Sequence, residues 1–467
     1  MLKKFKTLFI GDKKFYKMVI AIALPVMIQN AITQFVGLLD NVMVGNVGTD
    51  QMTGVAIANQ VIFIFNLAVF GAVTGAGIFG AQFYGKGDHT GVRYAFRFKI
   101  IAVTVITLAS IGVFIGFGEQ IIMAYLKGEG NVENIEAALE YGKEYLMIML
   151  IGFLPYALMS CYASTLRESR ETLLPMKAGI AALLVNLGLN AVLIFGLFGL
   201  PAMGSSGAAV ATVISRFVEF AIVAVWTHRN HEKHPFIKGA FRKLYIPGKM
   251  ALDILKKTIP LTANESLWAL GVALLGQCYS TRGYDVVAAV NIANTIAHLF
   301  SVSFMALGTA VGIIIGQQLG AGETEKAVDS ARKMMMFSIA TSIVFGGLLA
   351  LSAPFFPQLY KTEASIKALA TAMILIRVGH MPIYAIGHTC YYTIRAGGRT
   401  FITVLFDSVF ALGVVYPVAL LLSTFTNISI LPLYFVSQYI EIAKAVIGVT
   451  LVSNRRVWVR NLVEEKA

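Results

Sequence analysis

The chain has 467 residues, of which 57% are hydrophobic and 13% are charged, and its formal net charge is +13. A soluble globular protein carries about 25% charged residues, and the mean hydropathy of this chain is +0.73. The composition therefore excludes an ordinary soluble domain and predicts an all-α polytopic membrane protein.

Twelve long apolar runs predict twelve transmembrane helices, six in each half of the chain. A helix needs about 20 such residues to cross a hydrocarbon core ~30 Å thick. The first six spans are 18–44, 52–82, 98–118, 141–165, 174–198 and 205–227. The other six are 254–279, 287–316, 334–353, 367–394, 400–423 and 430–452. No small-residue cleavage site follows the first run, so we expect it to remain as the first membrane helix.

Basic residues divide the loops into two kinds. The amino-terminal segment and the even-numbered loops hold Lys3, Lys4, Lys6, Lys13, Lys14, Lys17, Lys86, Arg93, Arg97, Arg167, Arg170, Lys326, Arg332, Arg395 and Arg399. The central link 229–252 is the most basic segment, whereas odd-numbered loops such as 46–51 hold almost none. This positive-inside pattern predicts that both termini and the link are cytoplasmic. The net charge thus indicates sidedness and attraction to anionic lipid, with no need for a nucleic-acid partner.

The two halves repeat one another at an offset of 235 residues, since VAIANQVIFIF (55–65) matches VNIANTIAHLF (290–300). At the same offset Pro25 falls on Pro260, Gln82 on Gln317, and Gly85-x-Gly87 on Gly320-x-Gly322. Six spans return the chain to its starting side, so the repeat is parallel, with a pseudo-twofold axis along the membrane normal. We expect an N-terminal lobe at 1–228, a basic cytoplasmic linker at 229–252 and a C-terminal lobe at 253–467. Two such lobes suit a carrier that works by alternating access.

The two repeated glycine pairs lie in the turns GKGD (85–88) and GAGE (320–323). Glycine permits a positive φ, so these turns are predicted to be tight reversals. A phosphate-binding loop is not indicated, because no strand precedes either turn and no GK[ST] follows. The three cysteines, Cys161, Cys278 and Cys390, have unrelated spacings and indicate neither a metal site nor disulfides.

An ordered set of segments carries a resemblance to a known family. These segments are ALPVMIQNAITQFVGLLDNVMVGNVG (23–48), VAIANQ (55–60), AQFYGKGD (81–88), RESRETLLP (167–175), GQQLGAGE (316–323), RAGGRT (395–400) and RRVWVRNL (455–462). Together with the repeat they resemble the multidrug and toxic compound extrusion (MATE) family, over about residues 15–462.

The resemblance implies a secondary active transporter of the prokaryotic NorM/DinF type. Such a protein would exchange cytoplasmic organic cations, such as drugs and dyes, for external H⁺ or Na⁺ across the plasma (inner) membrane. We expect a monomer in the lipid bilayer, with no cofactor beyond the coupling ion. We do not expect an enzyme, because HExxH, CxxC and paired nucleophile and base motifs are absent from the sequence.

Two other classes stay open as alternatives. A lipid-linked oligosaccharide flippase of the same superfamily would need cationic residues in its cavity, and Arg216 and Arg377 are the candidates. A channel is a weaker alternative, because the sequence has no pore-loop filter and no ring of repeated acids.

Asp40 is an acid within the first predicted span, where an ionised carboxylate costs a few kcal/mol. No basic residue lies three or four positions away, so the carboxylate is either solvated near the outer boundary or part of a cation site. The resemblance implies a first-lobe site that Asp40 shares with Tyr145, Asn186 and Asn190. The two asparagines are four residues apart and share one helical face. Because Asn190 stands where some relatives have a second acid, H⁺ carriage by Asp40 is favoured over Na⁺ binding.

Glu265 is the corresponding acid of the second half, five residues after Pro260 in the seventh span. The proline frees a backbone carbonyl, which suits a kinked helix or an ion ligand. The resemblance places Glu265 at the second-lobe acidic position. Its usual aspartate partner in the tenth span is missing, and Tyr384 is nearest to that place. A Na⁺ ion at Asp40 or Glu265 therefore remains an alternative to H⁺.

Histidines and a tyrosine line one face of the tenth span, where His380, Tyr384 and His388 recur every four residues. His298 in the eighth span lies where some relatives carry a tyrosine near the cation. These residues either pack in the core or, with Glu265 and Asp407, form a proton relay.

Other intramembrane charges are predicted to pair with one another. Arg216 with Glu219, and Glu441 with Lys444, are three residues apart and are expected to form structural ion pairs. Asp407 has no local partner, so Lys444 of the neighbouring span is its candidate. Arg377 is expected to extend its charge towards the outer face.

Overall fold

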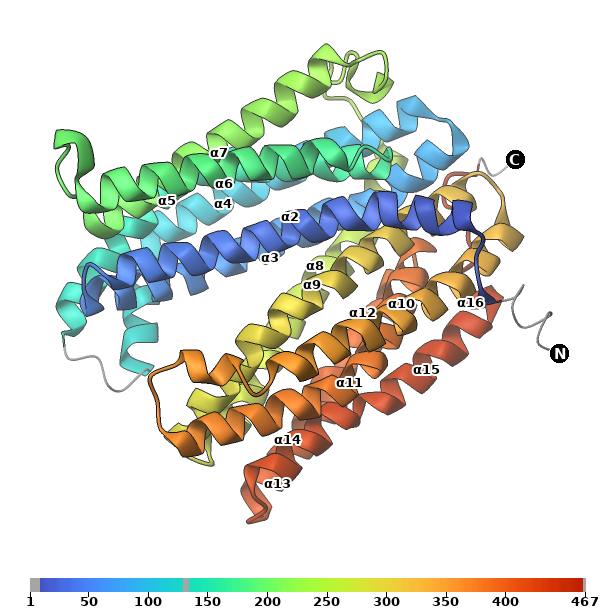
Figure 1. The fold of residues 1–467 in the computed structure, drawn as a ribbon. Coiled ribbons are helices and arrows are strands. Elements are labelled where there is room, and N and C mark those ends of the chain that lie inside the picture. The colour runs from blue at the N-terminus through green and yellow to red at the C-terminus, as the bar shows by residue number, and fades with distance from the viewer. Residues whose placement is uncertain (1–8, 129–133, 465–467) are drawn as a thin grey trace. The chain divides into compact units, whose positions relative to one another are not determined.

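The computed structural model describes residues 9–128 and 134–464. Lys3, Lys4 and Lys6 of the basic amino-terminal segment lie outside these residues. All regular elements within the described ranges are helices (Figure 1). The first six long helices are α2 (Lys13–Gly45), α3 (Thr49–Lys86), α4 (His89–Gly128), α5 (Ile135–Glu168), α6 (Leu173–Phe195) and α7 (Gly204–Arg229). The next four are α8 (Gly248–Ser280), α9 (Tyr284–Gly320), α10 (Thr324–Ser352) and α11 (Ala364–Ala396).

The last two predicted spans are each divided. The eleventh consists of α12 (Thr400–Val404), two π-helical segments, η4 (Leu405–Val409) and η5 (Ala411–Val415), and α13 (Tyr416–Phe425). The twelfth consists of α14 (Ile430–Tyr439) and α15 (Glu441–Ser453), and α16 (Arg455–Trp458) follows it. Among the described residues, three short 3₁₀ segments also occur, η1 (Leu197–Gly199), η2 (Pro235–Ile237) and η3 (Phe356–Leu359).

The twelve predicted spans all fall on these helices, so the predicted all-α class is confirmed. Eleven segments of the described residues are long and apolar enough to cross a membrane. The predicted seventh span is the exception, because Asn264, Glu265 and Gln277 make α8 more polar, although its 33 residues exceed the length needed. Several helices also begin earlier than their apolar runs, as α10 does at Thr324, because polar residues continue the helix beyond the hydrocarbon region.

The chain divides into two compact units, each discontinuous in sequence. Unit 1 comprises Met1–Met27, Ala81–Asp88 and Ile259–Ala467, and unit 2 comprises Ile28–Gly80 and His89–Thr258. The changes of unit therefore fall within α2, α3 and α8, or in the short turn after α3. The lobe boundaries expected from the sequence, at 228 and 253, stay a prediction.

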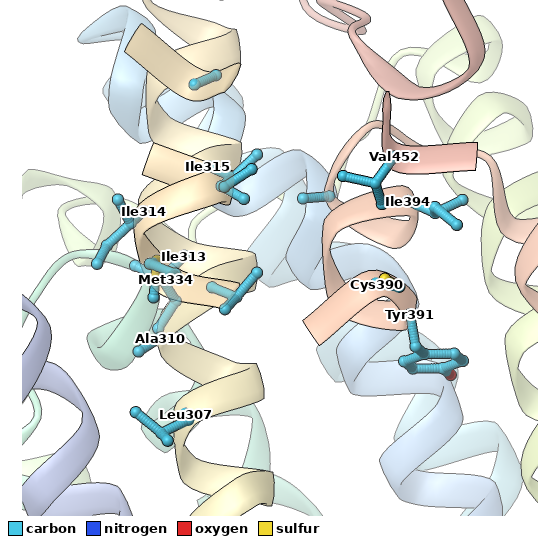
Figure 2. Close-up of a cluster of buried hydrophobic side chains, with 14 of the residues drawn as sticks. Leu307, Ala310, Ile313, Ile314, Ile315, Met334, Cys390, Tyr391, Ile394 and Val452 are labelled. Atoms are coloured by element: carbon cyan, nitrogen blue, oxygen red, sulfur yellow. The ribbon is translucent and has the colours of Figure 1, made fainter. Parts of the chain in front are cut away.

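Unit 1 is organised around α11, which packs against α9, α10 and α15. Figure 2 shows part of its buried core, with labelled side chains from these helices. The core includes Ile314 and Ile315 of α9, Met334 of α10 and Ile394 of α11, all at most 2% exposed. Lipid tails are as apolar as these side chains, so close packing and dispersion rather than the hydrophobic effect stabilise such a core.

Unit 2 packs α4 on α5, α5 on α7 and α6 on α7. Glycine permits the closest approaches in this unit. A Cβ on Gly54 of α3 would lie 2.4 Å from the carbonyl oxygen of Ala138 in α5, and one on Gly207 of α7 would lie 2.7 Å from that of Leu193 in α6. Such contacts between small residues and backbone are typical of helices in membranes.

The repeated glycine turns form a reciprocal contact in unit 1. A Cβ on Gly85 would lie 1.9 Å from the carbonyl oxygen of Gln317, and a Cβ on Gly320 would lie 1.9 Å from that of Gln82. Gly87 and Gly322 have φ values of +79° and +77°. The predicted tight reversals are therefore confirmed, and the repeat has a physical reason, because each copy supplies the glycine that admits the other copy's backbone.

The basic linker packs on α4 of unit 2. Arg97 donates to the carbonyl oxygens of Ala240, Tyr245 and Gly239 at 2.8–2.9 Å, and Arg93 donates to those of Phe236 and Pro235 at 3.2 Å. The linker residues Phe236 and Ala240 are buried, whereas its basic residues Lys238, Arg242 and Lys243 are exposed. The linker is thus an ordered segment whose charges face outward.

Candidate functional site

Asp40 lies near the end of α2, is only 8% exposed, and belongs to unit 2. Asn190 of α6 donates from Nδ2 to Asp40 Oδ1 at 2.5 Å. The hydroxyl of Thr212 on α7 donates to Asp40 Oδ2 at 3.4 Å. Both donors are neutral side chains, so the carboxylate is buried and hydrogen-bonded without a directly bonded cation.

A chain of amides extends this group. Asn190 Nδ2 also donates to Asn186 Oδ1 at 3.2 Å, and Asn186 Nδ2 donates to the Thr212 hydroxyl at 3.1 Å. The Oδ1 atom of Asn190 is buried without a hydrogen-bond partner. A buried acceptor left unpaired costs about 1–3 kcal/mol, so the site holds one oxygen that a cation or a protonated group could satisfy.

The fourth-span residue predicted for this site, Tyr145, lies on α5 and is 3% exposed. Its hydroxyl lies close to the side chain of Asn59, and it is near enough to Asp40 for electrostatic interaction. Asn59 belongs to the repeated VAIANQ segment. The structure thus brings together Asp40, Tyr145, Asn186 and Asn190, as the resemblance implied, and adds Thr212 and Asn59.

The predicted pair Arg216 and Glu219 lies on α7 near this site. Arg216 Nη1 is 3.2 Å from Glu219 Oε2, and the guanidinium stacks 5.1 Å from the ring centroid of Tyr156. Arg216 also lies within electrostatic range of Asp40. Glu219 thus holds the Arg216 guanidinium close enough to Asp40 to influence the charge of that carboxylate, although Arg216 and Asp40 are not bonded to each other.

The acids of the second half lie in a polar cluster of unit 1, and Asp407 is its best-connected member. Lys444 Nζ of α15 donates to Asp407 Oδ1 at 2.7 Å, and Asn264 Nδ2 of α8 donates to Asp407 Oδ2 at 3.1 Å. Ser408 donates to Asn264 Oδ1 at 2.7 Å. Asp407 and Ser408 occupy the π-helical segment η4, a geometry that is frequent at functional sites.

Glu265 belongs to the same cluster, because it lies close to Tyr391 of α11 and within electrostatic range of Arg395 and Asp407. Arg395, one turn further along α11, is 5% exposed, and its guanidinium lies 5.9 Å from the ring centroid of Tyr391. The sequence had placed Arg395 in a cytoplasmic loop, but it lies in the last turn of α11. The negative charges of Glu265 and Asp407 are therefore balanced by the positive charges of Arg395 and Lys444. The cluster is nearly neutral in formal charge.

The predicted direct pair of Glu441 with Lys444 is wrong. Glu441 Oε2 lies 2.9 Å from His380 Nε2, while Lys444 reaches across to Asp407. The reason is local geometry, because the helix is interrupted at Ile440 and α15 begins at Glu441. Glu441 and Asp407 thereby each have a basic partner on another helix.

The predicted column of rings on α11 is present, although the hydrogen bonds of a relay are not. Tyr384 and His388 have ring centroids 4.3 Å apart, and His380 and Tyr384 have centroids 6.0 Å apart. The Nδ1 atom of His388 is buried without a partner. Within the described part of the chain, no hydrogen bond joins His388 to Glu265 or Asp407.

A cavity of about 190 Å³ opens beside this column in unit 1. His298, Tyr384 and His380 line it, together with Glu441 and Arg377. Arg377 donates from Nε to the Tyr434 hydroxyl at 2.8 Å and from Nη2 to Asn294 Oδ1 at 2.9 Å. Two neutral partners therefore hold Arg377 at the cavity, and its extension towards the outer face stays a prediction.

One buried ion pair was not singled out from the sequence. Lys99 of α4 is fully buried, and its Nζ lies 2.6 Å from Glu168 Oε1 of α5. Gly77 and Gly80 of α3 make room for it, since a Cβ on either would lie 2.6 Å or less from a Glu168 carboxylate oxygen. Because Lys99 lies at the edge of an apolar run, its own position in the sequence does not indicate burial. The spacing of Gly77 and Gly80 was the one feature that could have indicated a buried partner for Lys99.

The arrangement of unit 2 suits the binding of a small cation by oxygen atoms. Asp40, the amide oxygens of Asn186 and Asn190 and the Thr212 hydroxyl are all hard oxygen donors. No group of three or more His, Cys, Asp or Glu side chains among the described residues could hold a metal ion. The site therefore fits a proton or an alkali cation better than a transition metal.

Comparisons with known proteins agree with this arrangement. The MatE family model matches residues 25–192 and 266–421, which is more than half of the chain. The chain is 27% identical over 421 residues to "Probable multidrug resistance protein YoeA" of Bacillus subtilis, covering 87% of each chain. It is 25% identical over 373 residues to "Probable multidrug resistance protein NorM" of Thermotoga maritima, covering 79% of this chain and 76% of that protein.

Solved structures show the same fold. One is described as the outward-facing conformation of a multidrug resistance MATE family transporter of the MOP superfamily, with a TM-score of 0.85 and 18% identity over 96% of this chain and 97% of that one. A MATE structure in the straight conformation has a TM-score of 0.85 and 18% identity, over 97% of this chain and 98% of that one. The helix order, the acidic site of unit 2 and the extent of the family match together establish that this chain belongs to the MatE family of multidrug and toxic compound extrusion transporters.

Proposed function

We propose that the protein is a secondary active multidrug efflux transporter that exchanges cytoplasmic organic cations for external H⁺, with Na⁺ as the alternative coupling ion. Asp40 is the residue on which the exchange depends. The observation that carries this proposal is a carboxylate 8% exposed whose hydrogen bonds come from the neutral side chains of Asn190 and Thr212. With no cation bonded to it, the ionised Asp40 is free to attract one.

The exchange depends on competition for one negative charge. At an effective dielectric constant of about 20, an organic cation ~4 Å from an ionised carboxylate gains about 4 kcal/mol. A proton or Na⁺ on Asp40 removes most of that attraction, which corresponds to roughly a thousandfold in affinity. Binding of the external ion therefore releases the drug, and departure of the ion to the cytoplasm restores the site.

The amide chain supports a proton as the coupling ion. Asn190 occupies the place next to Asp40 where a second acid would strengthen Na⁺ binding, so the site has one formal negative charge and neutral donors. The unpartnered Oδ1 of Asn190 can accept a hydrogen bond from a protonated neighbour or serve as one ligand of Na⁺. The same geometry thus accepts both ions, and the proton needs fewer ligands.

The proposal includes a location and an assembly. The protein acts as a monomer in the inner membrane of a prokaryote, with both termini and the basic linker in the cytoplasm. The positive-inside distribution of Lys and Arg supports this orientation. The bilayer and small organic cations are its partners, and no cofactor takes part.

The direct test is ethidium efflux from proteoliposomes that contain the full chain. We expect D40N to lower the initial efflux rate at least about tenfold, given the size of the charge interaction. E119Q is the matched control, because it makes the same change in a carboxylate that is 53% exposed and paired with Lys143 in unit 2. Wild-type efflux by D40N, with normal incorporation, would remove Asp40 from the mechanism.

Counterflow separates the proposal from its alternatives. A carrier preloaded with unlabelled ethidium accumulates labelled ethidium by exchange, whereas a channel only equilibrates it. A flippase of lipid-linked oligosaccharides would transport neither labelled nor unlabelled ethidium. Absence of counterflow in the wild-type protein would contradict the proposed exchange.

A further inference from the structure

The cavity of unit 1 holds a guanidinium that forms no salt bridge among the described residues. Arg377 lines this cavity with its guanidinium bonded to Tyr434 and Asn294, both of which are neutral. Within residues 9–128 and 134–464, no carboxylate forms a salt bridge with Arg377. Intramembrane charges are normally paired or mark a binding site, so an external anion is the missing partner.

The other acid of this cavity does not fill that role. Glu441 lies 2.9 Å from His380, and its helix also carries Lys444 one turn further on. His380 therefore holds this carboxylate, and although Arg377 lies within electrostatic range of Glu441, no salt bridge joins the two among the described residues. A guanidinium has five N–H donors, and the hydrogen bonds described for Arg377 use Nε and Nη2. Donors remain for the two oxygens of a carboxylate, the group that arginine binds best.

The rest of the lining indicates what the anion is attached to. Trp268, Tyr279, Phe304 and Tyr384 supply aromatic surface around Arg377. The volume of about 190 Å³ is below the ~300–1,000 Å³ typical of sites for drug-sized ligands. A flat ring that bears one acid group matches this combination of size, aromatic lining and a guanidinium with unused N–H donors.

We propose that this cavity binds small aromatic carboxylates, with the carboxylate on Arg377 and the ring among the aromatic side chains. This would extend the ligands of the protein from organic cations to organic acids and zwitterions, each class held in a different unit. The extension to transport rests on the proposed function, whereas binding to the cavity does not. The repeat supports a separate role, because Asn59 of the first copy lies beside Tyr145 near Asp40, whereas its equivalent Asn294 accepts a hydrogen bond from Arg377.

The probe is 4-nitrobenzoate, a small aromatic carboxylate whose nitro group quenches tryptophan fluorescence. The chain has three tryptophans, and Trp268 lies in the cavity lining. We expect 4-nitrobenzoate to quench the purified wild-type protein with saturation, and the W268F variant to lose most of this signal. Equilibrium dialysis with radiolabelled 4-nitrobenzoate measures the affinity independently of fluorescence. The methyl ester, which lacks the charge, should bind at least about tenfold more weakly.

Two variants test the role of the guanidinium from opposite sides. R377Q removes the charge and should weaken 4-nitrobenzoate binding by about tenfold to a hundredfold, with the methyl ester unaffected. N294D keeps the arginine but places a carboxylate where an amide oxygen now lies 2.9 Å from it, so an internal anion should displace the ligand to a similar extent. R332Q removes an arginine of α10 outside the cavity and should bind as the wild type does.

The outcomes separate this proposal from the proposed function. Equal binding of 4-nitrobenzoate by wild type, R377Q and N294D, or no saturable binding by the wild type, would overturn it. If R377Q does not fold, N294D still tests whether the ligand binds at Arg377, because this substitution adds a negative charge without removing the arginine. Failure of the D40N efflux test would contradict the cation exchange and leave the binding result standing.

Discussion

At the scale of single residues, the two intramembrane aspartates differ in their partners. Asp40 accepts hydrogen bonds from Asn190 and Thr212, whereas Asp407 accepts one from the ammonium of Lys444. A carboxylate with neutral donors keeps its charge available to a mobile cation, while one bonded to lysine has a resident cation. These partners support the proposed exchange at Asp40 and lead us to propose a structural contribution for Asp407.

Removing Lys444 should reveal that structural contribution. Loss of one partner of a buried pair leaves an uncompensated charge and costs about 3–5 kcal/mol. K444M should therefore lower the thermal unfolding midpoint in detergent, measured by fluorescence-detected size exclusion. The D407N/K444M double variant should recover most of the loss, because both charges are then absent.

The control for this experiment is K143M. Lys143 pairs with Glu119 at 2.6 Å, but both side chains are about half exposed, and such pairs contribute about 0–1 kcal/mol. Equal destabilisation by K143M and K444M, or a double variant no more stable than K444M, would mean that the Asp407–Lys444 contact does not stabilise unit 1.

The sequence predicted part of these sites for identifiable reasons. Acids within apolar runs are conspicuous, and a spacing of four placed Asn186 and Asn190 on one helical face. Thr212 carried no such signal, because a threonine in an apolar helix commonly bonds its own backbone. The partner of Glu441 was mispredicted because the interruption at Ile440 is not visible in the apolar pattern of span 430–452.

At the scale of helices, the contact between α3 and α9 in unit 1 depends on the absence of two side chains. A methyl group at Gly85 or Gly320 would lie 1.9 Å from a carbonyl oxygen, so the backbones would have to separate. We expect G85A and G320A each to lower the thermal unfolding midpoint, with an effect in the range of about 1–3 kcal/mol for overpacking.

Gly112 of α4 provides the matched control, since a Cβ there would meet nothing within 4 Å. G112A should be neutral or stabilising by up to about 1 kcal/mol, because alanine favours the helix. If G85A and G320A behaved like G112A, the close contact would not be required for the fold.

The docked linker contains an acid-sensitive residue. His234 is 6% exposed, both of its ring nitrogens lack hydrogen-bond partners, and its ring packs on Trp226 and Phe236. Burial lowers the pKa of His234 below its ordinary value, Glu171 opposes this shift, and Lys233 adds to it. The unfolded linker therefore binds the proton more strongly, so docking is fully stable above about pH 6.5 and weakens as the pH falls towards the lower pKa.

Limited trypsin digestion measures this effect, because Lys238, Arg242 and Lys243 of the linker are exposed. We expect cleavage in this segment to increase relative to the rest of the protein between pH 7.5 and 5.5. In H234L the increase should be absent, because leucine keeps the apolar packing and cannot take up a proton. The same pH response in H234L and the parent would show that another group controls docking.

Helix positions were predictable from hydropathy, whereas the details of the linker and of span 400–423 were not. Apolar length fixes a transmembrane helix, because the bilayer leaves the backbone no other hydrogen-bond partner. The linker is instead held by backbone carbonyls that accept from Arg93 and Arg97, and carbonyl acceptors leave no mark in a sequence. The π-helical segments around Asp407 depend on packing within unit 1, which a single span does not encode.

At the scale of the whole molecule, the repeat duplicates the helices and not the acids. At the offset of 235, Asp40 falls on Leu275 and Glu265 falls on Asn30. The parallel repeat predicted two similar lobes, but the charged groups diverged between them, so pseudosymmetry could not predict the partners of either acid. The two units therefore present chemically different sites, a single acid among amides in unit 2 and, in unit 1, a balanced cluster beside a cavity lined by Arg377 and Glu441.

This asymmetry predicts that ion coupling and transport rate can be separated by mutation. In proteoliposomes, external H⁺ should drive ethidium exchange in the wild type, and a Na⁺ gradient imposed at constant pH should have the smaller effect.

E265Q leaves Arg395 without one of its offsetting acids and should slow exchange while the dependence on H⁺ persists. D40N should abolish the dependence on H⁺, because its amide can neither bind nor release a proton, and the D40N/E265Q double variant should be no more impaired in coupling than D40N. A D40N protein whose residual exchange still responds to the proton gradient, or an E265Q protein that no longer does, would place the coupling ion in unit 1.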